Sequence, residues 1–442
     1  MGPGMSSEGG LRFALRALSH RNYRLFFAGQ TVSLIGTWLT RIATSWLVYR
    51  LTGSATLLGV IAFCGLVPTF VLSPIAGVIV DRHSRHRVIV ITQVLSMLQS
   101  FALAALSLAG VITVAEVAGL QLLQGVINAF DTPARQAFVV EMIEDRADLS
   151  NAIALNSSMF NGARLLGPSI AGVLIAVIGE GGCFLLDGIS YVAVIGSLLA
   201  MKVKPFVPAG GRKHVLHELR EGFHYAAGSA PIRAMLVLLS IVSLVGMPYT
   251  VLMPVMATLR LHGGAHTLGF LMAAVGLGAL GGAIRLAVRR TVLGLGRTIV
   301  TMAATFGVTL VLFAASRTLW LSLPLLVAVG FSMMLQTAST NTILQTILEE
   351  RMRGRVMAFY TMAVMGTAPF GALIAGAVAA RVGAPWTIAA GGVLCALASS
   401  WFALQLPALR RELRPIYQKL GILPEVAKGL QGAQDVPTAP AA

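Results

Sequence analysis

Polar side chains recur at steps of three and four inside segments that are otherwise apolar. The segment 23–49 carries Gln30, Thr37 and Arg41 in this pattern, together with Ser33 and Thr44. Such steps place side chains on one face of an α-helix. The pattern returns in three further segments, as Gln121, Gln124, Asn128, Asp131 and Arg135 in 114–137, as Ser157, Asn161 and Arg164 in 152–178, and as Ser332, Gln336 and Ser339 in 318–345. Because polar residues among apolar helices face protein or water, we expect these faces to line a cavity that binds a small molecule.

Arg41 is the sharpest single candidate for a binding residue. It lies well inside the apolar segment that ends at residue 49. At a rise of 1.5 Å per residue, this places it about 12 Å from the helix end, too deep for the side chain to reach bulk water easily. We expect it to contact either an anionic cargo or a neighbouring carbonyl group. The same two roles apply to Arg164, where the adjacent Gly167 and Pro168 favour helix packing.

Two carboxylates are candidates for proton coupling. Asp187 is well inside an apolar segment, where a buried carboxyl group can act as a proton carrier. The alternative is a position at the level of the lipid headgroups. Asp131 is followed four residues later by Arg135, so the two can pair on one helix face, or Asp131 can instead meet Arg85. Both arrangements of Asp131 give it a structural or gating role.

Motifs for catalysis, metal binding or nucleotide binding are absent from the sequence. No G-x-x-x-x-G-K-[ST] loop occurs, so we expect no ATP-driven transport. His262 and His266 have no third ligand nearby, and the three cysteines are far apart. We therefore expect a protein that is not an enzyme and that has no cofactor and no metal.

The composition explains what kind of element must carry these residues. The chain has 442 residues, of which 56% are hydrophobic and 11% charged, with a mean hydropathy of +0.81. Soluble domains carry roughly 25% charged residues. The chain is therefore expected to be an all-α membrane protein in contact with lipid. Its net charge of +16 lies between the apolar segments, so we expect topology signals and anionic lipid contacts rather than nucleic-acid binding.

Membrane-spanning helices need about 20 mostly apolar residues each. By that measure we expect twelve, at 23–49, 55–80, 87–109, 114–137, 152–178, 182–201, 233–257, 266–288, 297–316, 318–345, 356–380 and 385–406. Most of the 33 Lys and Arg residues fall at the two termini and in the even-numbered links. This bias predicts that both termini are cytoplasmic. We expect a multi-pass monomer in the cell membrane, inner or plasma.

The charged link that begins at Lys202 divides the spans into two blocks of six. Glycines recur at equal spacing in both blocks, as Gly167, Gly172 and Gly179 and as Gly371, Gly376 and Gly383. We read this repeat as a duplication that gives two pseudo-symmetric six-helix bundles. The expected units are an N-terminal bundle at 1–201, a cytoplasmic linker at 202–232, a C-terminal bundle at 233–406 and a cytoplasmic tail at 407–442.

The link after the second span reads GVIVDRHSRHR and resembles the signature G-x-x-x-D-R-x-G-R-R of the major facilitator superfamily. Gly77, Asp81, Arg82 and Arg85 match the signature, and Arg87 lies just beyond it. Ser84 and His86 depart from it. The resemblance implies a gate that latches one closed state and does not touch the substrate. The alternative is a basic turn that serves only topology.

Two further motifs refine the resemblance. ARLLGPSIAG in the fifth span, with Gly167, Pro168 and Gly172, resembles the glycine–proline motif of antiporters in this superfamily. The alternative is ordinary close packing of helices through small residues. In the fourth span, Gln121 stands where the superfamily often has an arginine that transfers protons.

Longer stretches resemble one group within the superfamily, the enterobactin exporters or transmembrane secretion effectors. These are GTWLTRIATSWLVYRLTGSATLLG from Gly36, NAFDTPARQAFVVEM from Asn128 and RPIYQKLGILPE from Arg414. The resemblance implies a secondary active transporter, most simply a proton-coupled antiporter that exports a siderophore or a drug-like molecule by alternating access. Two other functions stay open, namely a lipid flippase and a non-transporting membrane receptor.

Overall fold

The computed structural model describes residues 16–143, 145, 148–203, 215–289 and 291–419. Every regular element within these ranges is helical. Before the linker the elements are η1 (Arg16–Ser19), α2 (Arg21–Thr52), α3 (Ala55–Arg82), α4 (Arg85–Leu108), α5 (Val114–Glu141) and α6 (Leu149–Leu199). After it they are α7 (Val215–Gly228), α8 (Ala230–Ile241), η3 (Val242–Gly246), η4 (Met247–Thr250), α9 (Met253–Val255), η5 (Met256–Arg260), α10 (Ala265–Ala287), α11 (Leu295–Ala315), α12 (Leu319–Ile347), α13 (Glu350–Thr361), η6 (Met362–Gly366), α14 (Ala368–Val382) and α15 (Ala384–Lys419).

The long element α6 consists of two helical arms that run in opposite directions. Gly179 interrupts it with a φ of 71°, a conformation that glycine adopts without steric cost. The first arm is parallel to α2, since Tyr23 bonds to the carbonyl of Ala152 and Trp38 lies against Gly167. The second arm is antiparallel to α2, because Arg50 pairs with Glu180 while Gly29 lies against Ser197. The chain therefore reverses at Gly179, between the expected spans 152–178 and 182–201.

Nine helical stretches within the described ranges are long and apolar enough to cross a membrane. One of the nine is Asn151–Leu199, which contains both arms of α6. Helices α2 and α5, of 32 and 28 residues, are not among the nine, and both carry polar stripes. The fold class is thus an all-helical membrane protein, while the count of twelve spans stays a prediction.

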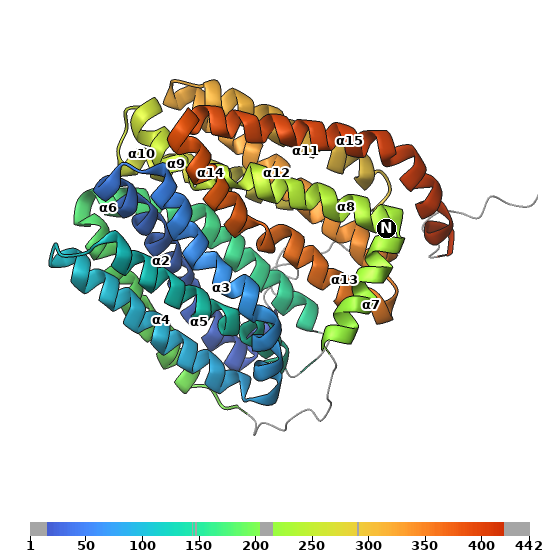
Figure 1. The fold of residues 1–442 in the computed structure, drawn as a ribbon. Coiled ribbons are helices and arrows are strands. Elements are labelled where there is room, and N and C mark those ends of the chain that lie inside the picture. The colour runs from blue at the N-terminus through green and yellow to red at the C-terminus, as the bar shows by residue number, and fades with distance from the viewer. Residues whose placement is uncertain (1–15, 144, 146–147, 204–214, 290, 420–442) are drawn as a thin grey trace, which may run out of the picture.

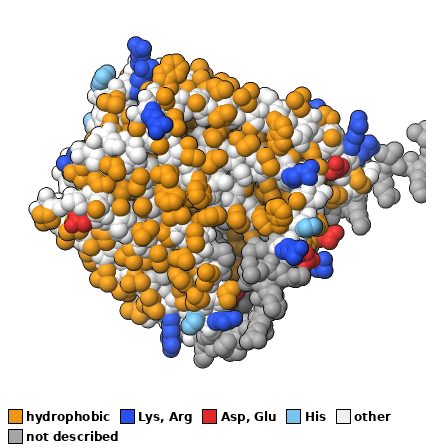
Figure 2. Space-filling view, in the orientation of Figure 1, with side chains coloured by type: hydrophobic (Ala, Val, Ile, Leu, Met, Phe, Trp, Pro, Cys, Tyr) orange, Lys and Arg blue, Asp and Glu red, His pale blue; other side chains and the backbone are white. Residues whose placement is uncertain are grey.

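The lipid-facing surface is visible in Figure 2, where apolar side chains cover most of the face and charged ones lie mostly toward its margins. Large side chains such as Val71, Ile75 and Ile91 are more than half exposed. Trp320 and Trp386, near the first residues of α12 and α15, are 87% and 74% exposed. Exposed tryptophans at helix ends are typical of residues that lie at the membrane–water interface.

The helices pack as two groups. Elements η1 and α2–α6 pack on one another, as do α7–α15, and the groups join mainly where α6 meets α10 and where α3 meets α14, with smaller contacts of α2 with α9 and of α3 with η6. We call the two main contacts the α6–α10 seam and the α3–α14 seam. A methyl group added to Gly172 would lie 2.6 Å from the Cα of Gly269, and one added to Gly376 would lie 3.0 Å from the Cα of Gly59. Both seams therefore bring backbone against backbone.

The two ends of the molecule differ in how the groups meet. We call the end with Met201 and Val215, on either side of the linker, the linker end, and the end with Gly53, Gly179 and Gly383 the far end. Both seams run from the far end to about the middle of the helices, where Gly276 lies against Arg164 and Phe70 against Gly366. Toward the linker end the groups diverge (Figure 1). The two groups are therefore in contact at the far end, while their helices lie apart at the linker end.

Two helices occupy parts of the expected linker and tail, and the expected domain boundaries stay predictions. Helix α7 forms inside the expected linker 202–232, because Glu221 pairs with Arg355 at 2.5 Å and with Arg351 at 3.2 Å and so holds α7 on α13. Phe223 and Phe359 add a ring contact at 6.1 Å. Helix α15 continues to Lys419, into the expected tail 407–442, although Pro407 and Pro415 lie within it. Tyr417 is 9% exposed, so the end of α15 also packs on the protein.

Candidate functional site

The polar face of α2 points between two neighbouring helices toward the other group. Thr44 accepts a bond from Gln121 of α5 at 3.3 Å, while Trp38 lies against Gly167 in the first arm of α6. The face between these two contacts holds Thr37 and Arg41, and both are exposed although they lie in the middle of α2. Gln30 belongs to the same face but is only 2% exposed. The exposed middle of α2 is therefore an inner surface and not a lipid-facing one.

Arg41 and Arg164 bring two positive charges together at this inner surface. The guanidinium of Arg41 lies over the ring of Trp38, 5.3 Å from its centroid. Arg164 is close enough that the two charges repel each other. Neither side chain forms an ion pair or hydrogen bond with another described residue. The site thus carries two cationic side chains whose charge no carboxylate among the described residues balances.

The stripe on α5 is largely satisfied by neighbouring side chains. Gln124 donates to Ser96 of α4 at 3.1 Å and to Asn128 at 3.2 Å. Asp131 pairs with Arg135 and accepts bonds from Thr92 at 2.8 Å and Gln93 at 2.9 Å, the last two from α4. Of the two expected pairings of Asp131, the one with Arg135 is present.

Asp187 forms a buried polar node where α2, α4 and the second arm of α6 meet. Its Oδ2 accepts bonds from Thr40 at 2.6 Å and Ser100 at 2.9 Å, and Gly36 packs directly on its Oδ1. Oδ1 is buried without a hydrogen-bond partner among the described residues, and the residue is 1% exposed. Asp187 therefore packs inside the protein and does not face lipid headgroups. Within the described part of the chain, no cationic side chain pairs with it.

The stripe on α12 is buried in this conformation. Ser332, Gln336 and Ser339 are each at most 1% exposed. Both amide atoms of Gln336 and the hydroxyl of Ser339 lack a partner among the described residues. These residues therefore do not meet the exposed surface around Arg41 here. The side chain of Asn161, from the expected stripe in the first arm of α6, lies outside the described residues.

The signature residues lie together at the linker end of the first group. Arg85 pairs with Glu141 at 2.5 Å and with Asp81 at 3.5 Å, while Arg82 and Arg87 are exposed. Gly77 has open space where a Cβ would lie. Every ion pair that described residues make with one another stays within one helix group. The latch between groups that the signature implies stays a prediction.

The glycine–proline motif lies at the α6–α10 seam. Gly172 meets Gly269, whose added Cβ would also lie 3.0 Å from the carbonyl of Pro168. Gly167 gives room to Trp38. Sequence reasoning missed Gly269 and Gly59, the partners on α10 and α3. The glycine-rich composition of α10 was a signal for such a contact, but spacing alone names no partner.

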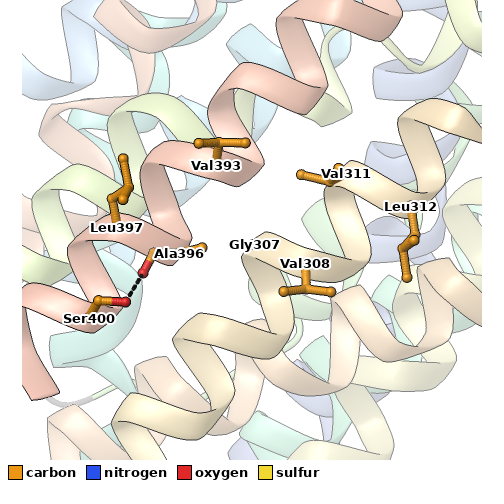
Figure 3. A pocket seen from close by; sticks show the side chains of 8 residues that line it. All are labelled: Gly307, Val308, Val311, Leu312, Val393, Ala396, Leu397 and Ser400. Atoms are coloured by element: carbon orange, nitrogen blue, oxygen red, sulfur yellow. Dashed lines mark hydrogen bonds between the residues drawn. The ribbon is translucent and has the colours of Figure 1, made fainter.

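A shallow groove on the second group contains none of the expected site residues. It has a volume of about 270 Å³ and lies between α11 and α15 (Figure 3). Its lining is apolar apart from Ser400, whose hydroxyl donates to the carbonyl of Ala396. Gly307 allows α11 to approach α15 there. The groove has no charged group that could select a polar cargo.

Comparison with known proteins identifies the family. The model of the transmembrane secretion effectors, a family of the major facilitator superfamily, matches residues 13–420. The staphyloferrin A transporter of Staphylococcus aureus is 29% identical over 58% of this chain and 64% of that protein. The multidrug efflux pump Tap of Mycolicibacterium fortuitum is 29% identical over 87% of this chain and 92% of that protein.

Solved structures show the same fold at low sequence identity. A POT family transporter in complex with 5-aminolevulinic acid has a TM-score of 0.69 at 11% identity, over 88% of this chain and 96% of that one. A bacterial homologue of the human lysosomal transporter Spinster, in an inward-facing and unoccupied conformation, has a TM-score of 0.64 at 13% identity, over 91% and 97%. The chain belongs to the transmembrane secretion effector family and has the major facilitator fold.

Proposed function

We propose that this protein is a proton-coupled exporter that moves a small organic molecule across the cell membrane by alternating access. The observation that carries the proposal is the inner surface of α2, where Thr37 and Arg41 are exposed at mid-helix. The two glycine seams hold the groups together between this surface and the far end, while the groups diverge between this surface and the linker end. A site reached from one side only is what alternating access requires. The relatives, a siderophore transporter and a multidrug pump, support export as the direction.

The proposed architecture is twelve spans in two pseudo-symmetric halves, acting as a monomer in contact with lipid. Nine stretches in the described part of the chain are long and apolar enough to cross a membrane, and one of them contains both arms of α6. When the two arms are counted separately and α2 and α5 are added, the number of spans is twelve. The proposed cargo-contacting residues have exposed or partly exposed side chains and are Thr37, Arg41, Gln121, Gln124, Asn128 and Arg164. Gln30, Ser332 and Gln336 are proposed to join them only when the groups close at the linker end.

Asp187 is the proposed proton carrier, in preference to Asp131. The charge of Asp131 is balanced by Arg135, so its carboxylate has a permanent partner. Asp187 has only hydroxyl donors, and burying an unpaired carboxylate costs several kcal/mol, roughly, unless the group binds a proton. Thr40, which donates to Asp187, is adjacent to Arg41 in the chain. In this proposal the proton binds to Asp187, on the side of α2 next to the one that carries Arg41.

Transport in reconstituted vesicles tests the function. Purified protein in proteoliposomes is expected to move one or more drug-sized compounds, offered as a panel of a cationic dye, a neutral macrolide and an aromatic carboxylate, against their gradients when a pH gradient is imposed. A protonophore should abolish this movement. Failure of the whole panel to move, or movement that ignores the protonophore, would contradict the proposal.

The proposed orientation places the linker end and both termini in the cytoplasm. It is supported by the concentration of basic residues at that end. In whole cells, a membrane-impermeant thiol reagent is expected to label a single cysteine placed at Arg317, in the far-end link between α11 and α12. A cysteine placed at Arg353, in α13, should react only after permeabilisation. Labelling of the second position in intact cells would reverse the assignment.

A further inference from the structure

We infer that Arg41 and Arg164 form a binding site for an organic anion, so that the exported cargo carries an oxyanion group such as a carboxylate. This inference rests on the proposed function and adds the chemical class of the cargo. Arg41 comes from α2 and Arg164 from the first arm of α6, at the level where the first arm reaches Gly276 of α10. The pair therefore lies where the two helix groups meet.

The charge balance of this region carries the inference. Arginine stays protonated in proteins, so neither side chain can lose its charge to relieve the repulsion between them. Asp187, in the second arm of α6, contacts α2, but its carboxylate accepts bonds from Thr40 and Ser100 and pairs with neither arginine. Glu180 is already paired with Arg50 at the far end. Because neither guanidinium pairs with a carboxylate among the described residues, an anion from outside the chain balances their charge.

The position of Arg41 is set before any anion binds. Its guanidinium lies over the ring of Trp38, and the Trp38 side chain packs against Gly167, which has no Cβ to displace it. A guanidinium that lies over an aromatic face still has N–H donors at the edge of its own plane, from which oxyanion oxygens can accept. Arg41 as a whole residue is exposed in this conformation.

The surroundings also define the rest of the cargo. Trp38 supplies an aromatic wall beside the cationic pair, while Gln121 of α5, which donates to Thr44 of α2, supplies an amide group. An oxyanion attached to an aromatic or otherwise apolar body satisfies both kinds of neighbour. A cation would meet two like charges and no described carboxylate with which to pair. We therefore expect the site to reject cationic compounds of the same size.

A matched pair of probes tests the site directly. Naphthalene-2-carboxylate and naphthalene-2-carboxamide differ mainly in charge, and their binding to the purified full-length protein can be measured by isothermal titration calorimetry. The carboxylate should bind at least about tenfold more tightly than the amide, because only the carboxylate balances the two guanidinium charges. Its affinity should fall as salt is added.

Substitutions assign the effect to the two arginines. Arg41→Ala and Arg164→Ala should each weaken carboxylate binding at least about tenfold, and Arg41→Lys should weaken it less, because a point charge remains. Arg381→Ala is the matched control, since Arg381 is an exposed arginine at the far end, and it should bind as the parent protein does. Equal binding of both probes, or unchanged carboxylate binding in Arg41→Ala and Arg41→Lys, would overturn the inference.

The outcomes separate this inference from the proposed function. If the vesicles export the cationic dye or the macrolide while the parent protein shows no preference for the carboxylate probe, the export function stands and the anion site falls. If the carboxylate binds with the expected dependence on Arg41 and Arg164 but no compound moves, the anion site stands and the export function falls.

Discussion

Replacing Asp187 with asparagine is expected to reduce proton-driven accumulation of cargo to the level of protein-free vesicles, while downhill exchange of cargo continues. The asparagine keeps the size of the side chain and an oxygen that can accept from Thr40 and Ser100, but it cannot bind and release a proton. The cargo site on the inner face of α2 stays intact, because Asp187 lies on a different side of that helix. The measurement is uptake into proteoliposomes with and without an imposed pH gradient.

Two further variants give this prediction its controls. Asp131→Asn removes a carboxylate that pairs with Arg135 and bonds to Thr92 and Gln93, so it should lower thermal stability more than it changes coupling. Ser100→Ala removes one of the two hydroxyl donors to Asp187 and should alter the pH at which transport is half-maximal without abolishing it. Full gradient-driven transport by Asp187→Asn would remove this residue from the coupling mechanism.

Replacing Gly172 with alanine is expected to hold the far end open and so to stop transport. The added methyl group would meet the Cα of Gly269 at 2.6 Å and the carbonyl of Ala265 at 3.1 Å. Both contacts are backbone, so no side chain can move aside. Overpacking of this kind costs typically about 1–3 kcal/mol, and here the cost falls on one conformation only. That shifts the equilibrium away from far-end closure by about 5- to 150-fold.

Accessibility distinguishes this effect from misfolding. A cysteine placed at Thr37 should react faster with a reagent added from the far side in Gly172→Ala than in the parent protein. Gly162→Ala is the matched control, because Gly162 lies in the same arm of α6 with no atom within 4 Å of an added Cβ. The equivalent change at the other seam, Gly376→Ala against Gly59, should act in the same direction. Normal transport and unchanged labelling in Gly172→Ala would show that the seam tolerates the extra atom.

Much of this fold could be predicted from the sequence, because hydropathy and charge determine where a chain can cross a membrane. The expected span 87–109 corresponds to Arg85–Leu108, and 266–288 to Ala265–Ala287. The face of α2 with Thr37 and Arg41 also followed from spacing alone. These features depend on the periodicity of one helix and not on its neighbours.

The features that depended on partners could not be predicted in this way. Asp187 bonds to residues on two other helices, and Gly172 meets a glycine on α10, so both contacts need the packing of the whole bundle. Helix α7 is held in place by the ion pair between Glu221 and Arg355, two residues that are far apart in the sequence. The burial of Ser332 and Gln336 reflects the conformation as well as the sequence. The spacing of polar residues predicts which of them share one face of a helix. It does not predict in which conformation of the transporter that face is exposed.

The two glycine seams also determine how the halves can move. Gly172 with Gly269 and Gly59 with Gly376 bring the backbones of the two halves together, and a rotation about the line that joins these two contacts changes them least. The first arm of α6 extends from Gly172 to Leu149 at the linker end, a lever of roughly 35 Å at 1.5 Å per residue. A turn of about 10° would therefore sweep the linker end through about 6 Å, on the same lever arithmetic. Close backbone contact at the two glycine pairs therefore allows a small rotation of one half against the other to produce a large opening at the linker end.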